Sequence, residues 1–235
     1  MKLICFSDTH QKHSRIGIPK CDVLIFSGDI CSSGELLQIS YFGNWLRDDQ
    51  ENFDKIIMIA GNHDFCFEHT KLAAISELTH YLGDKLVYLQ DSEYVYKGIK
   101  FYGSPWQPRF FNWAFNLNRG EQLKSVWELI PDDTNVLITH GPPHGIGDKT
   151  SLGVHAGCFD LLTRIKDLNN LVLHSYGHIH EGNGHYISDA FPNINFCNSS
   201  ICDKDYNPFN PAYEVIITDD SPYSVISCNK IYMKK

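Results

Sequence analysis

The first third of the chain alternates short apolar runs with longer amphipathic stretches. Leu3–Phe6, Val23–Phe26 and Ile56–Ile59 have the length and composition of buried strands. Two further stretches, Glu35–Leu46 and Leu72–Leu82, carry apolar residues at helical spacing. This order predicts a βαβαβ pattern, which is typical of a sheet covered by helices.

The rest of the chain is richer in short strands. Helical spacing predicts helices over Gln122–Leu129 and Phe159–Leu168, and Lys97-Gly98 predicts a hairpin turn. The remaining apolar runs predict strands over Leu86–Leu89, Tyr94–Tyr96, Lys100–Tyr102, Val136–Thr139, Leu171–Tyr176, Gly184–Ser188, Ile194–Cys197 and Tyr213–Thr218. Two sheets packed face to face, with helices outside, fit this mixture of elements.

Length and composition favour an ordinary globular protein. A chain of 235 residues is expected to form one domain, residues 1–235, with a core that needs no disulfides. The eight cysteines include no CxxC pair, and several lie in apolar strands, which predicts buried thiols in a reducing compartment. No signal peptide precedes the first strand and no apolar run could cross a bilayer, so we expect a cytoplasmic protein without a membrane partner.

The charge of the chain limits its partners. The formal net charge is −8, and an acidic surface repels polymeric nucleic acid. A small phosphate ester that meets bound metal remains a possible partner. The sequence indicates no oligomeric state.

Five motifs with side chains of the metal-ligand type follow the predicted strands. They are Asp8-Thr9-His10, Gly28-Asp29, Gly61-Asn62-His63-Asp64, Thr139-His140-Gly141 and Gly177-His178-Ile179-His180. Open α/β sheets place their sites at the carboxyl ends of strands, so these side chains are expected to converge. Two residues apart in an extended segment, Asp8 and His10 would point the same way, as would His178 and His180.

The motifs supply two carboxylates, one amide and four imidazoles. The candidate metal ligands are Asp8, His10, Asp29, Asn62, His140, His178 and His180. Mixed oxygen and nitrogen donors suit two divalent transition metal ions, Mn, Fe, Zn or Co, among which we favour Mn; they argue against Ca or Mg alone. Two cations about 3.5–4 Å apart would activate a bridging water and clamp the oxygens of an in-line displacement at phosphorus. Asp29 could bridge them with its two oxygens.

His63 and Asp64 are the candidate catalytic residues. His63 is not needed for ligation and could bind substrate, either by protonating the leaving oxygen or by donating to a phosphoryl oxygen. Asp64 could orient a neighbouring group or a metal ligand. His144 is a candidate for substrate binding or an exposed loop histidine, and for His155 we favour the exposed loop position.

An aromatic cluster lies in the middle of the chain. Its members are Trp106, Phe110, Phe111, Trp113 and Phe115. The rings could stack a nucleobase at the rim of a site. Alternatively, they belong to a packed loop that covers the sheets.

The ordered motifs resemble the calcineurin-like metallophosphoesterase superfamily, whose pattern is D-x-H, GD, GNH[DE], H and GHxH. The resemblance implies an α/β fold, a four-layer α/β/β/α sandwich of two mixed sheets. By the family's assignment, one metal would bind Asp8, His10, Asp29 and His180, and the second Asp29, Asn62, His140 and His178. Many members carry GDxxDRG, but no acid follows Asp29 within Ile30–Gly34, so a His63–Asp dyad is not expected.

Further segments resemble the metallophosphoesterase-domain (MPPED) branch of that superfamily. They are Ala60–Asp64, Gly103–Trp106, Phe115–Gly120, Thr139–Pro143 and Gly177–Gly182. Some animal members of the branch have glycine at the position of His178, which this chain keeps, so we expect a complete dinuclear site.

The branch implies a dinuclear metal-dependent phosphodiesterase that hydrolyses small diesters, cyclic nucleotides among them, through a metal-bridged hydroxide. A phosphomonoesterase or phosphoprotein phosphatase would use the same ligands. Some relatives of this fold have lost metal chemistry and serve as scaffolds, but the intact ligand set here argues against that alternative.

Overall fold

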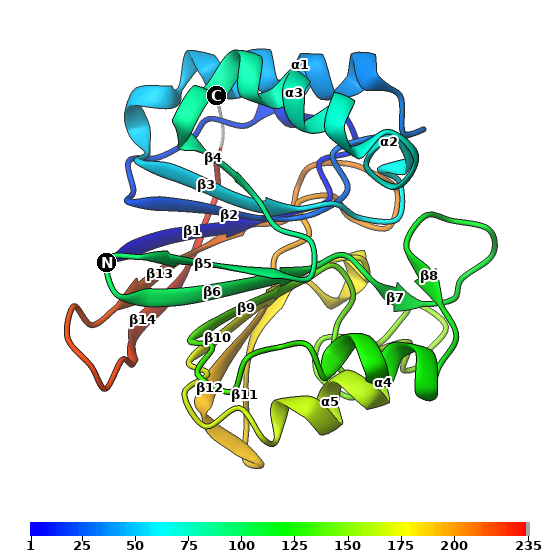
Figure 1. Ribbon diagram of the computed structural model, residues 1–235, viewed down its shortest axis with the longest axis vertical. Coiled ribbons are helices and arrows are strands. Elements are labelled where there is room, and N and C mark those ends of the chain that lie inside the picture. Colours follow the sequence, from blue (N-terminus) through cyan, green and yellow to red (C-terminus); the bar gives the residue numbers. More distant parts are fainter. Residues whose placement is uncertain (234–235) are drawn as a thin grey trace.

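The protein folds into two mixed β-sheets that pack face to face, with helices on the outer face of each (Figure 1). The computed structural model describes residues 1–233, and Lys234 and Lys235 lie outside them. The four layers confirm the predicted α/β/β/α sandwich. No helix within residues 1–233 is both long and apolar enough to cross a membrane.

The first sheet has six strands. In spatial order they are β14 (Val225–Ile231), β13 (Ala212–Ile217), β1 (Lys2–Phe6), β2 (Val23–Ser27), β3 (Lys55–Ile59) and β4 (Leu86–Tyr88). The strands β1 to β4 run parallel, and β13 and β14 are antiparallel to their neighbours. Helices α1 (Leu36–Asp48) and α3 (Lys71–Leu82) cover the outer face, and the short helix α2 (Phe65–His69) precedes α3.

The second sheet also has six strands. In spatial order they are β11 (Gly184–Ser188), β12 (Phe191–Asn198), β10 (Leu173–Tyr176), β9 (Val136–Thr139), β6 (Ile99–Ser104) and β5 (Ser92–Tyr96). Its four central strands are parallel, and both edge strands are antiparallel. Helices α4 (Glu121–Trp127) and α5 (Phe159–Ile165) cover the outer face, and β7 (Gln107–Pro108) pairs with β8 (Asn116–Leu117) beside it.

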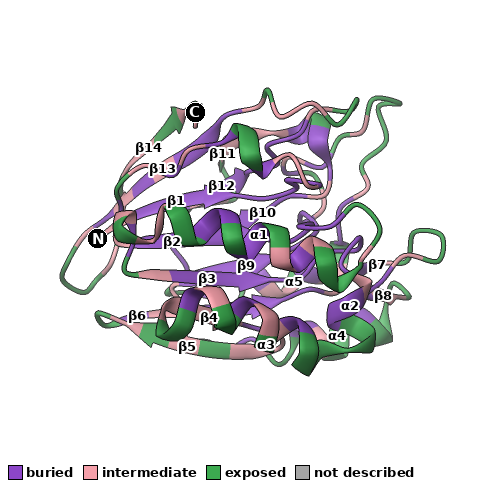
Figure 2. Ribbon diagram, turned by 90° about the horizontal axis from the view of Figure 1, so that it is seen from above, coloured by how far each residue is buried: buried purple, intermediate pink, exposed green. Residues whose placement is uncertain are grey.

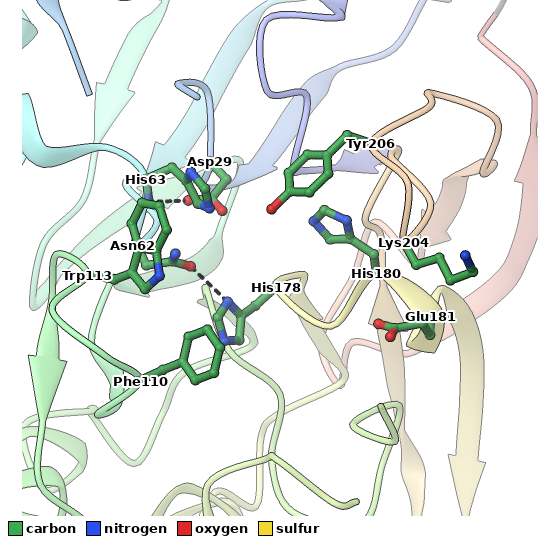
Figure 3. A pocket seen from close by; sticks show the side chains of 10 residues that line it. All are labelled: Asp29, Asn62, His63, Phe110, Trp113, His178, His180, Glu181, Lys204 and Tyr206. Carbon is green, nitrogen blue, oxygen red and sulfur yellow. Dashed lines mark hydrogen bonds between the residues drawn. The ribbon is translucent and has the colours of Figure 1, made fainter. Parts of the chain in front are cut away.

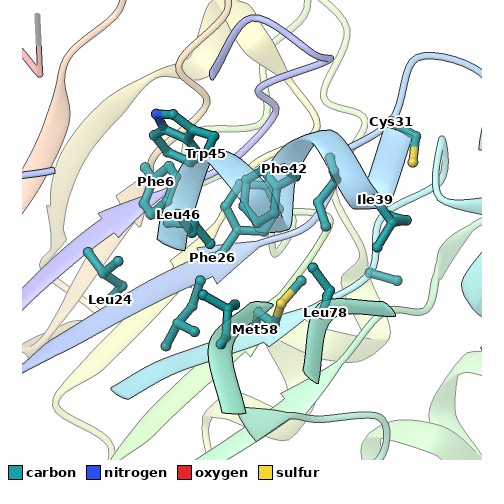
Figure 4. Packing of buried hydrophobic residues seen from close by; sticks show 14 of the residues in the cluster. Phe6, Leu24, Phe26, Cys31, Ile39, Phe42, Trp45, Leu46, Met58 and Leu78 are labelled. Carbon is teal, nitrogen blue, oxygen red and sulfur yellow. The ribbon is translucent and has the colours of Figure 1, made fainter. Parts of the chain in front are cut away.

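Alternation of side chains along the strands creates three apolar layers. In β1, Ile4 and Phe6 point toward α1 and α3, whereas Leu3 and Cys5 point toward the second sheet. In β9, Leu137 packs under α4 and α5. Figure 4 shows the layer under α1. Figure 2 shows that the central strands are buried, whereas the edge strands are partly exposed and the helices expose their outer sides.

The two sheets meet at the carboxyl ends of their parallel strands. Ser7, which follows β1, forms a β-bridge with Ser200, which follows β12. The hydroxyl oxygens of Ser27 in β2 and Ser175 in β10 are 3.0 Å apart. The loops that follow the central strands of both sheets are therefore held at one end of the sandwich, where the predicted motifs lie.

The strands and helices predicted from the apolar pattern are present, and their ends differ from the expected ones by a few residues. The pattern did not predict α2, β14, β7 or β8. Helix α2 is too short to show a helical period, and β14 is a partly exposed edge strand with a weak apolar pattern. The burial expected for the cysteines is confirmed for all except Cys228, which is half-buried.

The packing under α1 leads to a stability prediction. Phe26 is fully buried, and its ring centroid lies 5.0 Å from those of Phe6 and Phe42. Phe26→Ala would leave a cavity, so we expect the free energy of unfolding in urea to fall by about 3–5 kcal/mol. Phe111→Ala is the control, because Phe111 is 75% exposed, and it should change stability by less than about 0.5 kcal/mol. Equal effects of the two substitutions would contradict this packing.

Candidate metal centre

The predicted ligand side chains converge where the two sheets meet. The loops after β1, β2 and β3 bring the ligands from the first sheet, and the loops after β9 and β10 bring those from the second. Six of the seven side chains are buried, namely Asp8, His10, Asp29, Asn62, His140 and His180. His178 is half-buried. We call these seven side chains the donor cluster.

Asp8, His10 and His180 form one half of the donor cluster. His180 Nε2 lies 3.4 Å from Asp8 Oδ1 and 3.2 Å from His10 Nε2. His10 Nε2 lies 3.7 Å from Asp29 Oδ2. These atoms come from three separate loops, and their spacing would allow them to contact one cation.

Asn62, His140 and His178 form the other half. Asn62 Oδ1 lies 2.8 Å from both His140 Nε2 and His178 Nδ1. His140 Nε2 lies 3.4 Å from Asp29 Oδ2, the same oxygen that faces His10. Asp29 therefore lies between the two halves, as a bridging carboxylate would.

The hydrogen bonds behind the histidines test whether the donor cluster suits a metal. His10 Nδ1 lies 3.1 Å from the Cys31 carbonyl and His180 Nδ1 lies 2.9 Å from the Asp203 carbonyl. A carbonyl can only accept, so both Nδ1 atoms donate, and a neutral ring then carries a lone pair on Nε2. Two such lone pairs would face each other at 3.2 Å. A proton or a metal cation must therefore lie between them, and the donor set fits a metal.

The pKa values of the ligand histidines are shifted in opposite directions by burial and by the buried carboxylates. Burial lowers the pKa of His10 to about 4 and that of His178 to about 3, which keeps these rings neutral and able to ligate. Burial also opposes the charging of His140, but the Asp29 carboxylate outweighs it and raises the pKa of His140 to about 9. A metal ion at this site would replace the proton that the Asp29 carboxylate stabilises on His140.

The backbone around the donor cluster is not extended, which corrects the geometry expected from the sequence. Asp8, His10, Asp29 and His178 have φ values of 52°, 41°, 63° and 68°, in the left-handed region. Their side chains converge because the loops turn sharply after each strand, not because alternate residues of a strand share a face. Such conformations are unfavourable for residues with a Cβ and are typical of functional sites.

Two motif glycines allow the backbone to approach the ligands. A Cβ on Gly61 would lie 2.2 Å from Asp29 Oδ1, and one on Gly177 would lie 2.0 Å from Asp8 Oδ2. No side chain fits at either position without moving a candidate ligand. The glycines of these motifs are therefore required by the close packing of the donor cluster.

Asp64 joins two of the motif loops from behind the donor cluster. Its fully buried carboxylate accepts hydrogen bonds from the backbone N–H groups of Asp29 at 2.9 Å, Cys31 at 2.8 Å and Gly61 at 2.8 Å. Burial and the nearby Asp29 charge raise the pKa of Asp64 to about 6. This geometry favours an orienting role for Asp64 over contact with a substrate.

His63 is held by a backbone carbonyl. Its Nδ1 lies 2.9 Å from the Ser32 carbonyl oxygen, so Nδ1 donates and Nε2 is the free ring nitrogen. Ser32 stands where the GDxxDRG pattern has its second acid, so the carbonyl takes the place of that carboxylate. Trp113 covers the ring, with centroids 4.0 Å apart and planes at 32°.

A pocket of about 220 Å³ opens over the donor cluster (Figure 3). Besides predicted ligands and His63, its lining contains Phe110, Trp113, Glu181, Lys204 and Tyr206. The last three were not predicted, because Glu181 is not among the metal-ligand side chains of its motif and residues 201–211 contain no motif. Figure 3 shows Trp113 and His63 on one side of the pocket and Tyr206 and His180 on the other.

Some rings of the aromatic cluster line the pocket, and others belong to the packed loop. Phe110 and Trp113 line the pocket, as a stacking surface would. Phe115 is fully buried and packs against Trp106, with ring centroids 5.6 Å apart. Phe111 is exposed. Only part of the cluster therefore faces the site.

His144 and His155 gather around a different carboxylate. His155 Nδ1 lies 2.7 Å from Asp148 Oδ1, and His144 Nδ1 lies 3.8 Å from Asp148 Oδ2. Neither histidine lines the pocket over the donor cluster. Substrate binding by His144 stays a prediction.

Comparisons with known proteins agree with this geometry. The family model described as calcineurin-like phosphoesterase matches residues 1–182. The chain is 36% identical over 229 residues to metallophosphoesterase domain-containing protein 1 of Homo sapiens and of Mus musculus, covering 89% of this chain and 69% of each relative. A crystal structure with 16% identity aligns over 99% of both chains at a TM-score of 0.66, which supports the fold. The resemblance to the MPPED branch is thereby confirmed.

Metal binding provides a direct test of the donor cluster. We expect calorimetry of chelator-treated protein to find about two Mn²⁺ ions per chain. His180→Ala should lower the stoichiometry or the affinity, whereas His80→Ala, an exposed control on α3, should change neither. Because bound metal would displace the proton of His140, whose pKa is about 9, the apparent affinity should rise from pH 6 to pH 8, by up to about tenfold per pH unit for each displaced proton. Unchanged binding by His180→Ala would contradict the site.

The hydrogen bonds of Asp64 lead to a second test. Asp64→Ala would leave several buried N–H groups without their acceptor, so the free energy of unfolding should fall by at least about 2 kcal/mol. Urea titrations in chelator would exclude an effect of lost metal. Asp84→Ala is the control, because the Asp84 side chain is 96% exposed. A loss no larger than that of the control would refute the orienting role.

Proposed function

The chain belongs to the calcineurin-like phosphoesterase family, and from that premise we propose that it is a metal-dependent phosphodiesterase of small substrates. Its substrates would be phosphodiesters with compact organic groups, cyclic nucleotides among them. The observation that carries the proposal is the character of the pocket, which places aromatic walls beside the donor cluster.

The donor cluster would hold two divalent metal ions, for which we favour manganese. Asp8, His10 and His180 would bind one ion, Asn62, His140 and His178 the other, with Asp29 between them. When bound, such ions supply an activated water and polarise phosphoryl oxygens. The carbonyls of Cys31, Ser27 and Asp203 each accept a hydrogen bond from a ligand imidazole and so fix the nitrogen that faces the metal.

His63 would act on the substrate through Nε2. Because Nδ1 donates to the Ser32 carbonyl, Nε2 is the nitrogen that can protonate the leaving oxygen or donate to a phosphoryl oxygen. Trp113 packs against the His63 ring, and His63 is buried. His63 is thus oriented before substrate arrives.

The charge of the pocket favours a diester over a monoester. A monoester carries close to two negative charges at neutral pH, and a diester carries one fewer. Lys204 is the one cationic Lys or Arg side chain among the lining residues described, and its ammonium group lies 2.8 Å from Asp205. Phe110 and Trp113 instead offer apolar faces to the second organic group of a diester.

The experiment compares bis(4-nitrophenyl) phosphate with 4-nitrophenyl phosphate as substrates. We expect Mn²⁺-loaded protein to hydrolyse the diester faster, and chelator to abolish turnover. His63→Gln should lower kcat by about 10²–10⁴-fold with metal content retained. His80→Gln is the matched control, since His80 is exposed on α3.

The other outcomes of this experiment would indicate a different function or a different role for His63. Faster hydrolysis of the monoester would assign a phosphatase. Absence of turnover with both substrates, at confirmed metal content, would leave a scaffold or an enzyme too selective to accept these two esters. Full activity of His63→Gln would refute the proposed role of Nε2.

A further inference from the structure

A tyrosine from the segment between β12 and β13 lies against the donor cluster. The Tyr206 ring centroid is 4.8 Å from that of His10 and 5.2 Å from that of His180, with edge-to-face planes at 69° and 77°. Tyr206 lines the pocket, and Figure 3 shows its hydroxyl pointing into the pocket. The residue lies beyond residues 1–182, which the family model matches.

The backbone holds Tyr206 in an unfavourable conformation. Its φ is 61°, in the left-handed region that a tyrosine rarely adopts. The turn is closed by Asp203, whose side-chain Oδ1 accepts from the N–H groups of Asp205 and Asn207, each at 2.9 Å. Asn210 Nδ2 donates to the Cys202 carbonyl at 2.9 Å, so the residues before and after the turn are held together. An unfavourable backbone conformation that the surrounding hydrogen bonds maintain is typical of residues in functional sites.

One carbonyl fixes both Tyr206 and a candidate ligand. The Asp203 carbonyl oxygen accepts from the Tyr206 N–H at 2.9 Å and from His180 Nδ1 at 2.9 Å. The backbone of Tyr206 is therefore anchored to the same atom that orients the imidazole. Tyr206 is positioned with respect to the donor cluster and does not merely cover it.

The hydroxyl of Tyr206 is an unused donor. Within residues 1–233 it makes no hydrogen bond, whereas the Tyr176 and Tyr186 hydroxyls donate to backbone carbonyls at 3.0 and 2.8 Å. A phenol donates one hydrogen bond, and it does so most strongly to an anionic oxygen. The ring of His63 lies on the other side of the pocket, with its centroid 6.4 Å from that of Tyr206.

We propose that the Tyr206 hydroxyl donates a hydrogen bond to a non-bridging oxygen of the phosphate group bound over the donor cluster. The contact needs the neutral phenol and involves no transfer of its proton. Tyr206 and His63 would then contact the phosphate from two sides of the pocket. This inference rests on the proposed phosphoesterase function and adds a catalytic residue that the sequence motifs do not contain.

Tyr206→Phe tests the inference because it removes only the hydroxyl. Tyr41→Phe is the matched control, since Tyr41 is 56% exposed on α1. Three quantities are measured on Mn²⁺-loaded protein: metal content by mass spectrometry, the Kd of inorganic phosphate by calorimetry, and kcat/KM for bis(4-nitrophenyl) phosphate. We expect unchanged metal content, a Kd of phosphate raised by about tenfold or more, and a matching fall in kcat/KM.

The outcomes separate this inference from the proposed function. Phosphate binding by the wild type without diester hydrolysis would refute the phosphodiesterase proposal, and the change in Kd would still decide the role of Tyr206. Equal phosphate affinity in wild type and Tyr206→Phe would overturn the inference. So would a loss of metal in Tyr206→Phe at unchanged phosphate affinity, because the hydroxyl would then serve the metal. A wild type that neither binds phosphate nor hydrolyses the diester would overturn both proposals.

Discussion

The Asp29 carboxylate is buried between two groups of imidazoles, and the loops of the site are arranged around it. Oδ1 accepts the His63 N–H at 2.8 Å, and Oδ2 faces His10 at 3.7 Å and His140 at 3.4 Å. A carboxylate removed from water must be compensated by hydrogen bonds or positive charge. Asp29 raises the pKa of His140 and so favours a positive charge beside it. A pair of divalent metal ions would compensate the buried carboxylate more completely.

The sandwich supplies the rigidity that this arrangement needs. Parallel strands in both sheets end at the same level, and the bridge between Ser7 and Ser200 joins the sheets beside Asp8. Left-handed residues and glycines without room for a Cβ then bring the loops together. These conformations are unfavourable for an isolated loop, so packing of the three apolar layers must offset them.

The groups around the donor cluster decide what its chemistry could act on. His63 is oriented by a carbonyl, which fixes the ring without adding the negative charge that a carboxylate partner would bring. Phe110 and Trp113 make one side of the pocket apolar, and Tyr206 places a hydroxyl on the other. The site thus combines a highly charged floor with aromatic side chains and two charged ones, Glu181 and Lys204, on its walls. In the proposed function, a diester would present its charged group to the floor and its organic substituents to the aromatic rings.

The apolar pattern of the chain predicts every strand of the two six-stranded sheets except β14, and the motifs after the strands predict the side chains of the donor cluster. Apolar alternation and ligand-type residues after strands are local patterns, and parallel strands bring such residues to one edge. The groups that surround the donor cluster are apparent only in the folded protein. The Ser32 carbonyl behind His63, the separation of His144 from the pocket and the placement of Tyr206 leave no local pattern in the sequence. Each depends on contacts between loops that are distant along the chain, and these contacts form only once the two sheets have packed together.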